Sequence, residues 1–227
     1  NNYADYALER QMAMNPVGVY NLLDDLYEAS FNVAKQEKAE ILEFAKKSGF
    51  EGEIMPWDWG YYSDKLKIEK FDLNDEMMKP YFELSNVVGG VFGLATELYG
   101  IEFKPNKDIP VYQKEVTAYE VFDADGKFLS VFYTDFHPRE GKRGGAWMND
   151  FKGQWKENGV DSRPHVTIVM NFTRPTETKP ALLTFSEVET FLHEFGHALH
   201  GMLANSTYSS LSGTNVFRDF VELPSQI

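Results

Sequence analysis

The stretch that decides the fold runs from Thr184 to Leu203 and reads TFSEVETFLHEFGHALHGML. It contains the pattern H-E-x-x-H, in which His193 and His197 are four residues apart and Glu194 lies between them. Because positions i and i+4 share one face of an α-helix, both imidazoles can reach one cation, with Glu194 beside it. The pattern predicts a catalytic zinc site with two histidine ligands and a carboxylate placed to act on water.

Local signals predict that this stretch is a helix. Thr184 and Glu187 are typical of an N-cap and its partner three residues on, and Pro180 precedes them. Apolar residues then recur at spacings of three and four, which predicts one buried stripe with the histidines beside it. The stripe consists of Val188, Leu192, Phe195, Leu199 and Leu203.

A catalytic zinc ion usually has three protein ligands, so one more is needed. The longer motif H-E-x-x-H-x-x-G-x-x-H does not apply, because the chain has His200 and Leu203 where that motif has Gly and His. Beyond His197 the only acidic residues are Asp219 and Glu222. A carboxylate on a second helix packed against the first would complete the site. We expect Glu222 to be the ligand, although spacing alone does not separate it from Asp219.

Composition limits the class of protein. With 227 residues and 43% hydrophobic content, the chain can bury one sizeable core or two small ones. A net charge of -13 argues against a nucleic-acid groove, and no apolar run approaches the roughly 18 residues of a membrane span. The absence of cysteine leaves histidine and carboxylate as metal ligands. It also suits a cytoplasmic location, with the periplasm remaining open.

The first part of the chain is predicted to be helical. Asn15 and Pro16 are typical of a helix start, and Gly49 is typical of the stop that follows. The polar connector at residues 104–110 then separates helical from alternating periodicity. We therefore expect a helical segment over residues 1–104, which would be a scaffold or wall, and an α+β catalytic segment over residues 105–227. The expected helices of the first segment cover 16–48, 57–70 and 81–99.

Beyond the connector, apolar and polar residues alternate as in β-strands. Residues 116–122 and 128–133 flank a turn and predict a β-hairpin, and residues 165–172 predict a further strand. The fold class is therefore mainly α with a small antiparallel β-sheet. The lone histidines His137 and His165 are expected to be structural rather than metal ligands.

The run FLHEFGHALHGML followed by SGTNVFRDFVELPSQI resembles the thimet oligopeptidase family of zinc metallopeptidases. The SGTN, RDFVE and PSQI segments are most similar in sequence to the bacterial peptidyl-dipeptidase branch of that family. The resemblance also includes PWDWGYY at 56–62, KPYFELSNVVGGVFGLATELYGIEF at 79–103 and HPREGKRGGAWMNDF at 137–151. It implies a zincin-like catalytic region, built from the H-E-x-x-H helix and a helix that carries the glutamate ligand.

The resemblance also implies roles for particular residues. It implies that His193, His197 and Glu222 bind one zinc ion per chain and that Glu194 is the general base. His200 and Asp219 are expected to support or orient the ligand histidines. The glycine-rich loop is implied to lie near the active site, where its backbone would pair with a bound peptide as an added strand. The residues concerned are Gly144, Gly145, Ala146 and Trp147.

The reaction that the resemblance implies is hydrolysis of short peptides in a channel walled by helices. It would release C-terminal dipeptides or, alternatively, cleave internal bonds. Members of the family are longer than this chain, which begins without an initiator Met and stops five residues after Glu222. We therefore expect an internal piece, incomplete at its C-terminus, whose partner is the rest of its own polypeptide. In isolation, such a piece could be a metal-binding scaffold without turnover. No nucleic-acid or membrane partner is expected.

Overall fold

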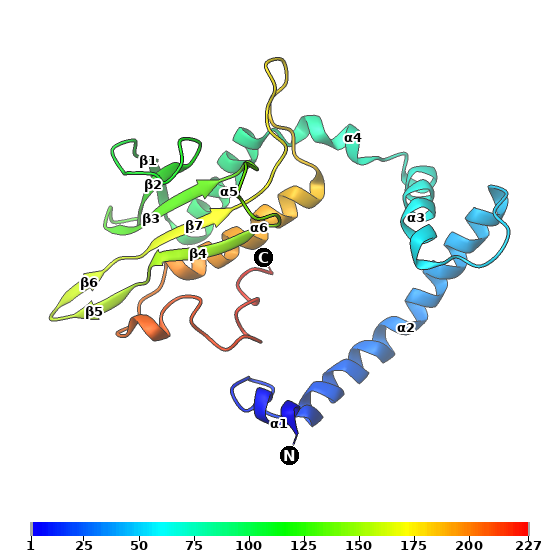
Figure 1. The fold of residues 1–227 in the computed structure, drawn as a ribbon, viewed down its shortest axis with the longest axis horizontal. Coiled ribbons are helices and arrows are strands. Elements are labelled where there is room, and N and C mark those ends of the chain that lie inside the picture. The colour runs from blue at the N-terminus through cyan, green and yellow to red at the C-terminus, as the bar shows by residue number, and fades with distance from the viewer. Residues whose placement is uncertain (1, 227) are drawn as a thin grey trace. The chain divides into compact units, whose positions relative to one another are not determined.

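The chain forms two compact units. The structure is a computed structural model that describes residues 2–226 (Figure 1). The two units divide between Met77 and Met78. The change from helical to alternating periodicity predicts a boundary further along the chain, at residues 104–110. The division falls earlier because the helix α5 (Leu84–Tyr99) packs in the same core as the sheet that follows it.

The first unit is helical. Its long helix α2 (Pro16–Lys47) begins at Asn15, whose side chain accepts a hydrogen bond from the backbone N–H of Gly18, as the sequence predicted. The other helices are α1 (Tyr3–Leu8) and α3 (Pro56–Phe71), which follows the predicted range. The core of the unit is small and consists of Ile41, Ala45 and Ile54, with Leu42, Phe50, Tyr62 and Leu66 packed around them.

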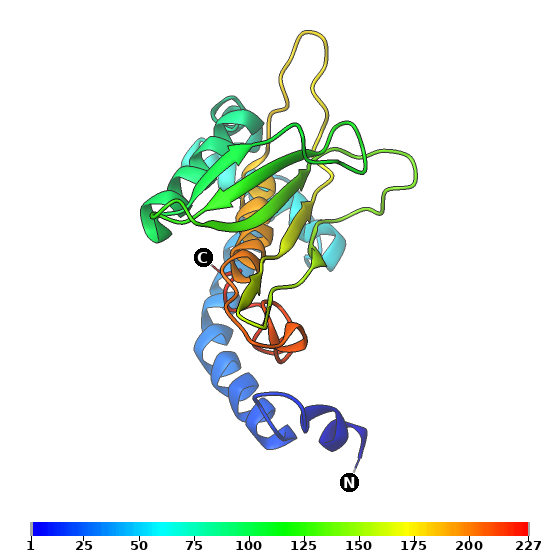
Figure 2. The same ribbon diagram turned by 90° about the vertical axis from the view of Figure 1, so that its left-hand side faces the viewer.

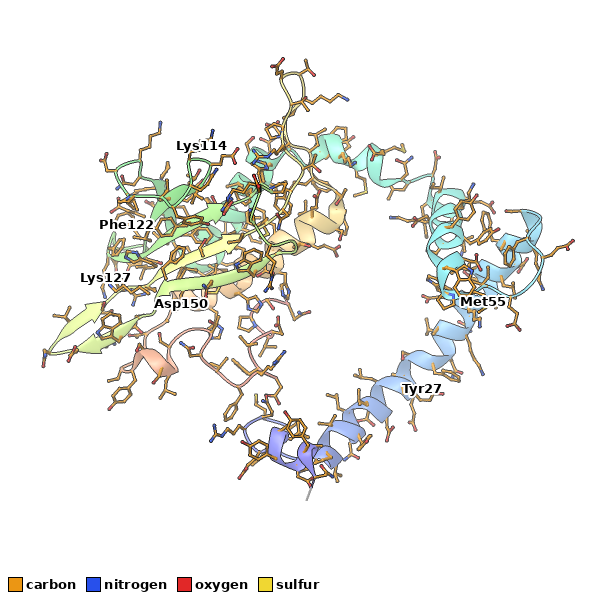
Figure 3. The ribbon with its side chains drawn as sticks, in the orientation of Figure 1. Tyr27, Met55, Lys114, Phe122, Lys127 and Asp150 are labelled. Carbon is orange, nitrogen blue, oxygen red and sulfur yellow. The ribbon has the colours of Figure 1, made fainter. Side chains whose placement is uncertain are left out.

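Most of α2 makes few contacts within its unit. Tyr27, labelled in Figure 3, stacks on Phe31 with ring centroids 4.7 Å apart, yet its side chain is exposed. Leu22, Leu23 and Leu26 are exposed as well. The proposed function of this helical region as a channel wall stays a prediction. Among the described residues, no helix combines the length and the apolar character that crossing a bilayer requires.

The second unit combines a five-stranded sheet, a two-stranded ribbon and two main helices. The main helices are α5 and α6 (Phe185–Met202). The sheet contains β1 (Glu102–Pro105), β2 (Thr117–Phe122), β3 (Phe128–Asp135), β4 (Trp147–Lys152) and β7 (His165–Val169), and the ribbon contains β5 (Trp155–Glu157) and β6 (Val160–Ser162). Short helical turns are α4 (Asp75–Met78), η1 (Lys79–Tyr81) and η2 (Ser209–Leu211).

The sheet has the strand order β1-β2-β3-β7-β4 and is mixed. The predicted hairpin of β2 and β3 is confirmed, but β7 runs parallel to β3, with His165 opposite Val131. The expectation of an antiparallel sheet was therefore wrong. The physical reason is that β7 is not joined to β3 by a turn: β4 and the β5–β6 ribbon lie between them, and such a crossover allows parallel pairing.

Both main helices cover the same face of the sheet (Figure 2). Phe132 of β3 lies 6.1 Å from the ring of Phe92 on α5 and 5.9 Å from the ring of Phe195 on α6. The two helical rings are themselves 5.9 Å apart. This aromatic cluster fixes which side of α6 faces the core, because residues 191, 195, 198 and 202 of the helix are all buried in it.

The ends of α6 are satisfied by specific hydrogen bonds. The Thr184 side chain accepts from the backbone of Glu187 at 3.2 Å, and the Glu187 side chain accepts from the Thr184 backbone at 2.8 Å. At the other end, the Arg163 guanidinium donates to the carbonyls of Met202 at 2.7 Å and Ala204 at 3.0 Å. A cation at this end also complements the helix dipole.

The loop between β3 and β4 is tied down by Asp135. Its buried carboxylate accepts two hydrogen bonds of 2.8 Å from Arg139, one of 2.9 Å from Lys142 and one of 2.8 Å from the Tyr112 hydroxyl. Lys142 also donates to the carbonyl of His137 at 2.8 Å. Burial alone would raise the pKa of Asp135, but these hydrogen bonds outweigh burial and lower the pKa to about 2.

We predict that replacing Phe191 by alanine lowers the free energy of unfolding by about 3–5 kcal/mol, because it opens a cavity in the core. Phe191 is fully buried, with the ring of Phe136 5.3 Å away. Phe185→Ala, in the same helix but at a position that is 47% exposed, should cost much less. Chemical denaturation followed by circular dichroism measures both. Equal losses would contradict the placement of Phe191 in the core.

A second prediction concerns pH. The pKa of Asp135 is lowered from 3.8 to about 2, so its ionised form stabilises the fold above pH 4. This stability, about 2 kcal/mol, should be lost as pH falls from 4 to 2. Asp135→Asn should be less stable at pH 7, because Lys142 is left buried without its partner, and should show a shallower loss between pH 4 and 2. If the free energy of unfolding fell equally in the two proteins between pH 4 and 2, the assignment would be contradicted.

Candidate metal site

Three side chains from two segments of the second unit converge. His193, His197 and Glu222 each offer one ligand atom within 4.8 Å of one another. The two histidine rings share one face of α6, with centroids 4.9 Å apart. One carboxylate oxygen of Glu222 lies 3.3 Å from Nε2 of His193 and 3.0 Å from Nε2 of His197. Within residues 2–226, this is the group of histidine and acidic side chains that could hold a metal ion.

The donor set fits a divalent transition metal. Two imidazole nitrogens and one carboxylate oxygen are the ligands of many open catalytic sites, in which a fourth position is left for water. Nδ1 of His197 is buried without a hydrogen-bond partner among the described residues. The Nε2 atoms of both rings lie near the same carboxylate oxygen of Glu222.

Glu222 does not lie on a helix, which corrects the expectation of a second helix. Residues 218–222 form turns, with the N–H of Phe220 and the N–H of Leu223 each donating across a turn at 2.9 Å. Leu223 precedes Pro224, and a residue before proline avoids the helical conformation. The chain therefore turns beside α6 and presents Glu222 to it, with 60% of the glutamate side chain exposed.

Glu194 lies beside the two histidines and is buried. Burial raises its pKa, and the neighbouring His193 and His197 counter part of that effect. The backbone N–H of Met148, on β4, also donates to the Glu194 carboxyl group. This contact places the start of β4 next to Glu194.

The glycine-rich segment leads directly into β4. Gly145 has a φ of 87°, and its carbonyl accepts a hydrogen bond of 2.7 Å from the Asn171 side chain. β4 is the last strand of the sheet and pairs with β7 on one side, with Trp147 opposite Val169. Trp147 therefore lies in the edge strand directly before Met148, and Gly144, Gly145 and Ala146 lead into it. A contact between their backbone and a peptide stays a prediction.

The remaining histidines are not among the three converging side chains. His137 has its Nδ1 3.3 Å from the Phe172 carbonyl, and His165 pairs with Val131 within the sheet. His200 lies near Phe220, with ring centroids 6.4 Å apart, and burial lowers its pKa. Asp219 lies in the same turns as Glu222. Support of the ligand histidines by His200 and Asp219 stays a prediction.

Sequence reasoning missed two contributors near Glu222. The Ser225 hydroxyl lies 2.7 Å from the carbonyl and 3.1 Å from a carboxylate oxygen of Glu222. Its position three residues after the glutamate is typical of a local turn contact, and that spacing was the available signal. The second contributor is Gly196, where α6 comes close to the Pro224–Ser225 backbone. No local pattern indicates such a contact.

The chain is similar to known peptidases over most of its length. The chain is 43% identical over 227 residues to dipeptidyl carboxypeptidase of Escherichia coli (strain K12), and 41% identical over 227 residues to oligopeptidase A of the same organism. These two matches include 100% and 99% of this chain, respectively. The chain spans only 33% of the length of each relative. Thimet-like oligopeptidase of Dictyostelium discoideum is 36% identical over 203 residues, which is 85% of this chain and 29% of that relative.

The resemblance to the thimet oligopeptidase family is confirmed by these matches. A family model described as "Peptidase family M3" matches residues 1–227. Because this match extends over the whole chain, the chain belongs to peptidase family M3.

Proposed function

We propose that the protein containing this chain is a zinc metallopeptidase that hydrolyses short peptides. The observation that carries the proposal is the convergence of His193, His197 and Glu222 beside Glu194. Membership of peptidase family M3 supports it. Because the chain spans only 33% of the length of dipeptidyl carboxypeptidase and of oligopeptidase A, the activity is proposed for the whole protein.

In this proposal His193, His197 and Glu222 hold the zinc ion of a zincin-like catalytic region. When bound, zinc supplies a Lewis acid that activates water and polarises the carbonyl of the substrate. Glu194 takes a proton from the attacking water and delivers it to the leaving amine. Its position is suited to this function, because it follows His193 on α6 and its carboxyl group is oriented by the Met148 backbone.

The peptide substrate is proposed to lie along β4. This strand ends the sheet, so an extended peptide could add to it through backbone hydrogen bonds. Gly144 and Gly145 would let the peptide backbone approach closely, since neither carries a side chain. The loop before β4 is held by Asp135 through Arg139 and Lys142, which supports a fixed rather than an adaptable edge.

Within this reaction class, we favour release of C-terminal dipeptides. The SGTN and RDFVE segments resemble the sequence of the bacterial peptidyl-dipeptidase branch. The relative that is 43% identical is a dipeptidyl carboxypeptidase. Cleavage of internal bonds is the alternative, and the 41% identity to oligopeptidase A favours it almost equally. A further alternative is that the 227-residue piece alone binds metal without turnover.

The proposal is tested by zinc content and peptide cleavage in the same preparation. We expect one zinc ion per chain by elemental mass spectrometry and cleavage of a quenched fluorescent peptide. A matched peptide with an amidated C-terminus should be cleaved poorly if dipeptides are released from a free carboxylate, and equally well if internal bonds are cut. Zinc without cleavage in both the piece and the longer protein would support a scaffold, and neither zinc nor cleavage would overturn the proposal.

Replacing Glu194 by glutamine should retain zinc and lower kcat about 10²–10⁴-fold, because the amide cannot accept the proton from water. Glu189→Gln, also on α6 but exposed, is the matched control and should retain activity. The measurement is kcat and zinc stoichiometry for both variants. Full activity of Glu194→Gln would refute its assignment as the base.

A further inference from the structure

We propose that Gly196 is a positioning residue that sets the approach of Glu222 to the two histidines. The inference rests on the proposed function, because it concerns how the third ligand is delivered. Gly196 lies on α6 between His193 and His197 and is buried. A Cβ atom added there would lie 2.7 Å from Cα of Ser225 and 3.1 Å from the carbonyl carbon of Pro224.

These contacts leave no room for a side chain. Both neighbouring atoms belong to the backbone, so they cannot rotate away as the end of a side chain could, and real Cβ atoms essentially never come within 3.0 Å of another atom. Any residue larger than glycine at position 196 must therefore displace the Pro224–Ser225 segment or α6. Since the aromatic core holds α6 against the sheet, the segment should move.

Moving this segment moves Glu222. The Ser225 hydroxyl lies within hydrogen-bonding distance of the Glu222 carbonyl, at 2.7 Å, and of its carboxylate, at 3.1 Å. Ser225 is itself only 3% exposed, whereas the Glu222 side chain is 60% exposed. The turn that carries Glu222 therefore mainly determines the orientation of its side chain. The backbone that follows this turn packs against Gly196.

Glycine at this position is not explained by helix formation. Glycine weakens a helix relative to alanine, so its presence in the middle of α6 needs another cause. The same helix offers a comparison at Gly201, where an added Cβ would meet the end of the Met148 side chain at 2.8 Å and Val166 at 3.2 Å. Those neighbours are side chains of the sheet, whereas the neighbours of Gly196 are backbone atoms of the segment that follows Glu222.

The test compares Gly196→Ala with Gly201→Ala by competition for zinc with a chromophoric chelator. We expect Gly196→Ala to weaken zinc binding about 10–100-fold, the usual effect of disturbing a group that supports a ligand. Gly201→Ala should alter the melting temperature of the zinc-free protein but leave zinc affinity within about threefold. The visible spectrum of cobalt-substituted protein should change only in Gly196→Ala, because it reports the geometry of the ligands.

A double-mutant cycle separates positioning from general destabilisation. If Gly196 acts through Glu222, then Gly196→Ala should add no further loss of zinc affinity to Glu222→Gln. Additive losses would overturn the proposal, as would wild-type zinc affinity in Gly196→Ala. Failure of Gly196→Ala to fold while Gly201→Ala folds would assign Gly196 to the fold alone and would also overturn it. Absence of zinc binding in the unaltered protein would instead overturn the proposed function.

Discussion

The packing of α6 against the sheet is the constraint on which the candidate site depends. Phe191 and Phe195 bury their rings among those of the sheet and of α5, and this fixes the rotation of the helix about its axis. With 3.6 residues per turn, the positions two residues after these aromatics point away from the core. His193 and His197 occupy those positions. The hydrophobic effect thus aims two polar side chains that contribute nothing to the core themselves.

The polar groups of the site depend on close approach of backbone segments. The Pro224–Ser225 backbone lies against α6 where Gly196 leaves space, and the Met148 backbone reaches the Glu194 carboxyl group from β4. Each places a hydrogen-bonding group beside a carboxylate, so small shifts of these segments would change the chemistry of the site more than the stability of the fold.

Electrostatics fixes the loop that leads to the site. Asp135 ends β3 and gathers Arg139 and Lys142, which come from the loop itself. Because Lys142 is also buried, the ion pair is expensive to break from either side. A loop rich in charge and glycine, which the sequence predicts to be exposed and irregular, is thereby held against the end of the sheet. Its chemistry was visible in the sequence, but the pairing of its charges was not.

Local order determined most of what the sequence could predict. The Thr184–Glu187 capping box, the helix that follows it, the β2–β3 hairpin and the pairing of His193 with His197 all depend on residues within a few positions of one another. The parallel pairing of β7 with β3, the approach of Glu222 to the two histidines and the packing of the Pro224–Ser225 backbone on Gly196 depend on segments tens of residues apart. Only tertiary packing brings such segments together, because no local periodicity records which distant backbone will lie alongside.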